Sequence, residues 1–134
     1  MPIVTELELA SATSRFFDEF VEAFRSFDGK TIAQRYRAPY LAFHGRGVSD
    51  VFLSNEDTAE YFQTIVNAYH ARGCRSCRYT RLEVAPLGNE CALASVTWEL
   101  LAQNETELGT WRESYNLCLV EGRFYVFAST DHAA

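Results

Sequence analysis

The stretch GTWRESYNLCLVEGRFYVFAST, residues 109–130, decides the fold. It contains two runs in which apolar and aromatic residues alternate with polar ones, and Glu121-Gly122 separates the runs. Alternation with a period of two is typical of strands that bury one face, and a two-residue turn with glycine joins antiparallel neighbours. Residues 110–121 and 123–131 are therefore predicted to form a β-hairpin.

More strands are predicted on the N-terminal side of this hairpin. Residues 75–85 and 91–103 are rich in β-prone residues and are separated by Pro86-Leu87-Gly88. Two shorter runs, residues 40–44 and 48–53, flank a turn at Gly45-Arg46-Gly47 and are expected to pair.

Helical patterns occur only before Gly73. The first helix carries phenylalanines on one face and ends at Asp28-Gly29, while Thr5 or the serines of residues 11–14 could cap its start. A short helix is predicted over 31–37, and a third begins after Ser54 and ends at Gly73. The sequence thus predicts an α+β fold, with three N-terminal helices packed on a strongly curved antiparallel sheet.

Composition narrows the class of protein. The chain has 134 residues, of which 48% are hydrophobic, and this predicts one globular domain over residues 1–134. A net charge of −6 disfavours nucleic acid and anionic membranes as partners. No apolar run is long enough to span a membrane and no secretory signal is visible, so we expect a cytoplasmic protein with four reduced cysteines.

This order of helix, short helix, hairpin, helix and four long strands resembles the nuclear transport factor 2-like superfamily. That superfamily includes SnoaL-like polyketide cyclases, ketosteroid isomerase, scytalone dehydratase and limonene epoxide hydrolase. The resemblance implies a cone-shaped, cystatin-like sheet around an apolar pocket, and frequent homodimers. It does not carry over the ketosteroid isomerase mechanism, because Phe16, Phe17 and Phe20 stand where that enzyme has its oxyanion tyrosine, and residues 40–44 include no carboxylate.

Aromatic residues with polar edges are the candidate ligand-binding residues. In a dry core their polar groups would need hydrogen-bond partners, whereas in a pocket these groups can contact a ligand. Ordinary core packing is an alternative for each of them. We predict that they line a pocket between the first helix and the concave face of the sheet, and that this pocket binds a small apolar or aromatic molecule. The predicted set is Tyr36, Tyr40, Trp98, Trp111 and Tyr115.

The alternative function is a cofactor-independent isomerase, cyclase, dehydratase or hydrolase that uses general acid/base catalysis. Its candidates on the apolar face are His44, Glu113 and His132, each of which could instead lie in water at a turn, a sheet end or a terminus. If Val120 pairs with Arg123 and the register is regular, Arg112 lies opposite Asp131 on the outer face. That pair is a second catalytic candidate, or simply an ion pair.

Cys74 and Cys77 have the spacing of half a zinc site or of a redox dithiol. No second pair of ligands accompanies them, so no metal and no cofactor is predicted. A third class of function, a protein-interaction module, would require phenylalanines that fill the cavity and a large exposed apolar patch.

Self-association is the last expectation from the sequence. The long strands leave an outer face that three helices cannot cover, and its residues are polar but mostly uncharged. We expect a homodimer through this face, flanked by Arg112 and Asp131. The outer-face residues in this prediction are Ser95, Thr97, Asn116, Cys118 and Tyr125.

Overall fold

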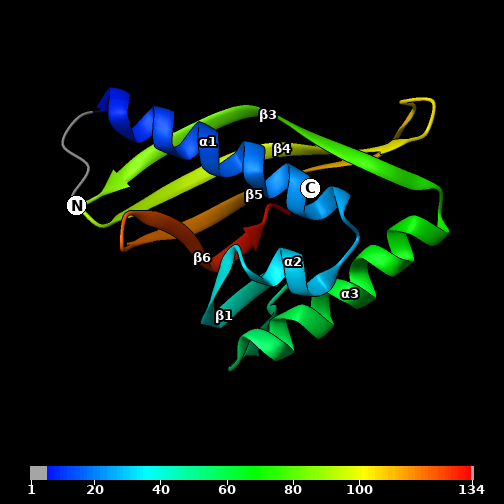
Figure 1. Cartoon of the computed structure of the whole chain (residues 1–134), viewed down its shortest axis with the longest axis horizontal. Coiled ribbons are helices and arrows are strands. Elements are labelled where there is room, and N and C mark those ends of the chain that lie inside the picture. The colour runs from blue at the N-terminus through cyan, green and yellow to red at the C-terminus, as the bar shows by residue number, and fades with distance from the viewer. Residues whose placement is uncertain (1–5, 134) are drawn as a thin grey trace.

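A computed structural model describes residues 6–133 and shows helices packed against a six-stranded curved sheet (Figure 1). The elements follow in the order α1 (Glu6–Arg25), α2 (Gly29–Ala33), β1 (Tyr36–Gly45), β2 (Val48–Phe52), α3 (Asn55–Ala71), β3 (Cys74–Leu87), β4 (Cys91–Ala102), β5 (Glu107–Val120) and β6 (Arg123–Asp131). The α+β fold and the predicted order of elements are confirmed.

The placement of the helices differs from three helices grouped at the N-terminus. Only α1 is N-terminal, α2 is a five-residue helix, and α3 follows the β1–β2 hairpin in the middle of the chain. Tyr36 already belongs to β1, so the short helix ends earlier than predicted. The predicted cap at Thr5 lies outside the described residues, whereas Ser54 caps α3 by accepting a hydrogen bond from the Asp57 amide at 3.1 Å.

The strands are ordered β2-β1-β6-β5-β4-β3. All neighbours are antiparallel except β1 and β6, which run parallel and so depart from the purely antiparallel sheet predicted. The pairing of Val120 with Arg123 around the Glu121-Gly122 turn is as predicted.

A β-bulge in the last hairpin changes the register that the sequence suggested. Leu117 pairs with Val126, but Asn116 pairs with Ala128, so Phe127 is an extra residue in β6. Since one inserted residue exchanges the two faces of a strand, every side chain of β6 beyond Phe127 points to the opposite face from the one predicted.

The helices cover the concave face of the sheet in two places. In α1, Phe17 and Phe20 are fully buried, and their rings contact Trp98 and Tyr115 at centroid separations of 5.5 to 6.3 Å. In α3, Phe62 packs 4.7 Å from Tyr36. The phenylalanines of α1 therefore leave little room over β4 and β5, and open space remains only towards α3.

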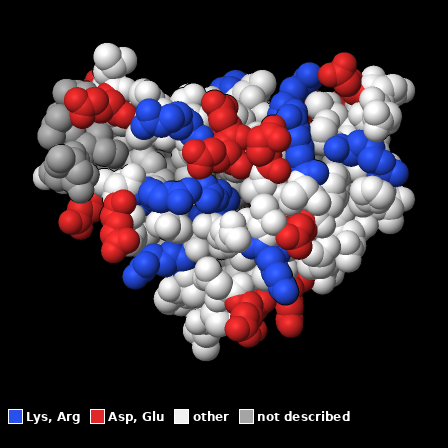
Figure 2. Space-filling view, viewed as in Figure 1, with Lys and Arg blue, Asp and Glu red and all other residues white. Residues whose placement is uncertain are grey.

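Charged side chains on the face seen in Figure 2 are mixed in sign. Arg25 pairs with Glu22, while Arg35 and Arg123 both approach Glu19. Among the described helices, none is long and apolar enough to cross a membrane.

Candidate functional site

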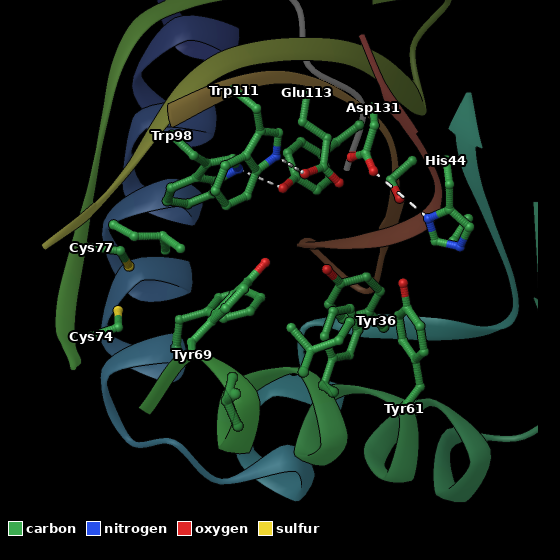
Figure 3. A pocket seen from close by; sticks show the side chains of 18 of the residues that line it. Tyr36, His44, Tyr61, Tyr69, Cys74, Cys77, Trp98, Trp111, Glu113 and Asp131 are labelled. Atoms are coloured by element: carbon green, nitrogen blue, oxygen red, sulfur yellow. Dashed lines mark hydrogen bonds and ion pairs between the residues drawn. The ribbon is translucent and has the colours of Figure 1, made fainter. Parts of the chain in front are cut away.

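A cavity of about 120 Å³ lies between α3 and the concave face of the sheet. The lining includes all five aromatic residues predicted from the sequence, and Figure 3 labels Tyr36, Trp98 and Trp111 among them. Trp98, Trp111 and Glu113 come from the sheet, and Tyr61 and Tyr69 face them from α3. Whether these side chains bind a ligand stays a prediction, but the fold brings them together.

The position of the cavity differs from the predicted one, which was next to the first helix. Its helical wall is the buried face of α3. In the lining, α1 provides Phe24 and the loop between α1 and α2 provides Phe27. The aromatic face of α1 packs directly against β3, β4 and β5 and leaves no space there. The open volume therefore lies beside α3. The helical pattern predicts that Phe62, Ile65, Val66 and Tyr69 are buried, but the predicted ligand-binding set contains neither these residues nor Tyr61.

Rings pack around the cavity as a continuous aromatic cluster. Tyr36 and Tyr40 have centroids 4.6 Å apart, and Phe52 lies 4.4 Å from Tyr61. Burial raises the pKa values of Tyr36, Tyr40 and Tyr61, and it raises that of Tyr69 to about 12. These hydroxyls are therefore neutral at neutral pH and act as hydrogen-bonding groups within an apolar wall.

Glu113 is the centre of the polar part of the cavity. The Trp111 indole N–H donates to Glu113 Oε1 at 2.9 Å. The Trp98 indole N–H donates to the Tyr115 hydroxyl at 2.7 Å, which leaves the Tyr115 proton free to be donated to Glu113. Two aromatic donors thus hold the carboxyl of Glu113 in one orientation.

Asp131 lies beside Glu113, since the two residues are direct partners across β5 and β6 and their side chains are hydrogen-bonded. Two carboxyl groups can share a hydrogen bond only if one of them is protonated. Burial raises the pKa of Glu113 from 4.5 to about 8, and repulsion from Asp131 is the second largest cause of this rise. The pair therefore holds one proton at neutral pH.

His44 connects this pair to the rim of the cavity. Its Nδ1 atom is 3.7 Å from Asp131 Oδ2 (Figure 3). Its Nε2 atom is 2.9 Å from Asp50 Oδ2. The side chain of His44 is 28% exposed and that of Asp131 is 41% exposed, so both lie at the mouth of the cavity. A line of acid and base groups thus runs from the buried Glu113 to the surface.

The bulge at Phe127 overturns the predicted pairing of Arg112 with Asp131. The extra residue turns Asp131 into the cavity, and Arg112, on the outer face, instead pairs with Glu83 and donates to Thr97 Oγ1 at 3.2 Å. Ser129 also turns inward and shares a buried hydrogen bond of 2.7 Å with the Tyr40 hydroxyl.

His132 is likewise displaced from the face where the sequence placed it. It is exposed on the outer side of the sheet, where its Nε2 atom lies 2.7 Å from Ser114 Oγ. The regular alternation after the turn gave no sign of the bulge, because Phe127 is itself a good strand residue.

Cys74 and Cys77 line the end of the cavity away from His44 (Figure 3). Both thiols are free, and burial raises the pKa of Cys77 to about 12, which keeps it a protonated and weakly reactive thiol. Within residues 6–133 no three acidic, histidine or cysteine side chains gather in a way that could hold a metal ion.

Comparisons with known proteins agree with this architecture. Residues 8–134 match the family described as "NTF2-like protein (DUF6841)". A search of the curated proteins finds no match.

Solved structures share the fold at low sequence identity. A protein of unknown function with a cystatin-like fold from Nostoc punctiforme is 12% identical, with a TM-score of 0.75 over 96% of this chain and 92% of that chain. An NTF2-like protein with a cystatin-like fold from Novosphingobium aromaticivorans is 11% identical, with a TM-score of 0.73 over 93% and 81%. An NTF-2 like protein of unknown function from Shewanella oneidensis is 13% identical, with a TM-score of 0.70 over 91% and 97%. Sequence and fold together place the chain in the NTF2-like family DUF6841.

Proposed function

We propose that the chain binds a small, mainly apolar organic molecule in the cavity between α3 and the sheet. The observation that supports this function is an open volume of about 120 Å³ inside a cluster of aromatic side chains. Protein interiors normally contain few voids larger than a water molecule, because unfilled volume costs stability. A cavity of roughly 150 Å³ is large enough for benzene, so a one-ring molecule is the size to expect.

The lining has the composition of a ligand site. Rings from β1, β4, β5 and α3 provide an apolar surface, and a few polar groups converge on it at Glu113, Asp131 and Ser129. Sites for small molecules typically combine such a surface with a small number of fixed polar groups that orient the ligand.

Binding can be tested with one-ring probes such as benzyl alcohol and tert-butylbenzene. At saturating concentrations we expect the melting temperature to rise by about 5–10 °C, because a ligand that binds only the folded state stabilises it. Ala42 is buried in the lining, so Ala42→Leu should fill the cavity and abolish the shift.

Ala85 is exposed on β3 and provides the matched control, since Ala85→Leu adds the same atoms away from the cavity. This variant should respond to the probes like the original protein. A melting temperature that no probe changes would contradict the binding proposal.

General acid/base catalysis on an apolar carbonyl compound is the second candidate function. The observation that favours it is the hydrogen-bonded pair of Glu113 and Asp131 in the cavity, with His44 next to Asp131. A carboxyl with a pKa of about 8 can exchange a proton efficiently near neutral pH.

This candidate predicts proton exchange between a bound ketone and solvent. We expect one-ring ketones such as acetophenone to gain deuterium next to the carbonyl in heavy water, faster than in buffer, as measured by NMR. Glu113→Gln should remove the acceleration, whereas Glu90→Gln, at an exposed position, should keep it. Exchange at the buffer rate with every ketone would favour binding without catalysis.

A further inference from the structure

Among the described residues of the cavity lining, the side chains that can carry charge near neutral pH are two carboxylic acids and one histidine. In the part of the chain that the structure describes, its lining includes Glu113, Asp131 and His44 and contains no lysine or arginine. Two guanidinium groups contact lining residues from outside the cavity. The Arg72 Cζ lies 5.3 Å from the centroid of the Tyr69 ring, and Arg25 Nη2 donates to the Cys77 carbonyl oxygen at 3.5 Å. Within residues 6–133, no ion pair joins a lysine or arginine to Glu113 or Asp131, so a ligand in the cavity meets these acids without a fixed lysine or arginine charge beside them.

The aromatic rings favour the same sign of ligand charge. The face of a tyrosine or tryptophan ring is electron-rich and attracts cations, and tryptophan does so most strongly. Trp98 and Trp111 lie on one side of the open volume, and Tyr36 from β1 and Tyr61 and Tyr69 from α3 lie across from them, so rings stand on two sides of it (Figure 3). Walls of this kind hold organic ammonium groups in other proteins.

We propose that the cavity selects a small organic cation, one ring or an equivalent apolar group that carries an amine or quaternary ammonium, over neutral and anionic molecules of the same size. This inference rests on the proposed binding function and adds the class of ligand. The cavity and its rings provide the apolar contact, and the carboxyl pair provides the countercharge.

Binding of such a cation is coupled to the proton that Glu113 and Asp131 share. A positive charge next to the pair favours its fully ionised form, so the proton leaves to solvent as the cation enters. The other titratable groups that face Glu113 are the tyrosine hydroxyls of β1, β5 and α3, whose raised pKa values keep them neutral, and His44, which lies beyond Asp131. Affinity for a cation should therefore increase as the pH rises towards 8 and above.

Three probes separate charge from size: phenyltrimethylammonium, its uncharged carbon isostere tert-butylbenzene, and benzoate. The charge of the first does not depend on pH. The chain has two tryptophans, Trp98 and Trp111, and both line the cavity, so quenching of their fluorescence reports occupancy. At pH 8.5 we expect phenyltrimethylammonium to bind roughly tenfold more tightly than tert-butylbenzene, and benzoate to bind most weakly.

Two variants assign the preference to the carboxyl pair. Glu113→Gln keeps the shape of the side chain and removes its charge, so the ratio of the two affinities should fall towards one. Glu90→Gln removes the same charge from an exposed position and should leave the ratio unchanged. If Glu113→Gln does not fold, the unaltered chain still gives a test, because its affinity for phenyltrimethylammonium should rise roughly tenfold from pH 6 to pH 9 while that for tert-butylbenzene stays constant.

The outcomes distinguish this inference from the binding function on which it rests. Equal or tighter binding of tert-butylbenzene, or a cation affinity that does not change with pH, would overturn the selection for cations and leave the binding function standing. The absence of binding by all three probes would overturn both.

Discussion

Glu113 and Asp131 show how neighbouring residues decide the behaviour of a side chain. Both are ordinary carboxylic acids in the sequence, and both are partners in the same hairpin. Glu113 lies deepest, accepts hydrogen bonds from Trp111 and Tyr115, and has its pKa raised by burial and by Asp131. Asp131 instead points towards His44 and the rim. Glu113 therefore holds the proton of the pair at neutral pH, and Asp131 lies between Glu113 and solvent.

The first prediction concerns the pH dependence of stability. Folding raises the pKa of Glu113 from 4.5 to about 8, so the folded chain holds a proton that the unfolded chain releases between these values. The contribution of Glu113 to stability is therefore most favourable below pH 4.5 and is lost as the pH rises to 8. The loss amounts to as much as about 1.4 kcal/mol per pH unit.

Glu113→Gln removes this titration and keeps a side chain that can accept from Trp111 and donate to Asp131. We expect its free energy of unfolding, measured with urea from pH 5 to 8, to decline less than that of the original chain. Glu90→Gln should decline as the original does. An equal slope in Glu113→Gln would mean that Glu113 is ionised in the folded protein.

At the scale of elements, alternation and turn signals predicted all six strands and most of α1 and α3. The bulge could not be predicted in this way, because Phe127 fits either face of a strand and nothing local marks it as the extra residue. Its placement depends on how β6 packs between β5 and β1, which involves residues far apart in the chain. The sequence therefore identified His44 and Glu113 as candidates but put Asp131 and His132 on exchanged faces.

Contact between α2 and α3 gives a second prediction. Gly29 begins α2, and a Cβ atom added there would collide with the backbone carbonyl of Ala59 and meet Gln63. The Gly29 amide also donates to Gln63 Oε1 at 2.7 Å, which holds the two helices together. Gly29→Ala should therefore push α2 away from α3 and lower the free energy of unfolding by about 1–3 kcal/mol.

Gly109 provides the matched control for this substitution. A Cβ atom at Gly109 would have no neighbour within 4 Å, and its φ lies outside the left-handed region. Gly109→Ala should leave the denaturation midpoint unchanged or raise it slightly. A Gly29→Ala variant as stable as Gly109→Ala would show that α2 can shift without cost.

At the scale of the whole molecule, the outer face of the sheet is the feature that a single copy leaves uncovered. Ser95 and Ser114 satisfy each other there with a hydrogen bond of 2.6 Å, and Arg112 is occupied by Glu83. Towards the β1–β2 edge, Leu41 is 42% exposed and Val51 is 58% exposed, and the two are partners across the hairpin. Polar groups that are already paired, next to exposed apolar ones, are typical of a surface that a second subunit covers.

The last prediction is therefore a homodimer through this outer face, with Arg112 but not the inward-facing Asp131 at its border. Light scattering should give twice the 15.2 kDa mass of the chain at micromolar concentration, since interfaces that bury about 1,600 Å² stay intact at that concentration.

Leu41→Lys places a charge in the apolar part of the face and should give the monomer mass. Leu87→Lys changes an exposed leucine at the end of β3 and should stay dimeric. A dimer that Leu41→Lys leaves intact would have to use another surface, and a monomeric original chain would refute the association itself.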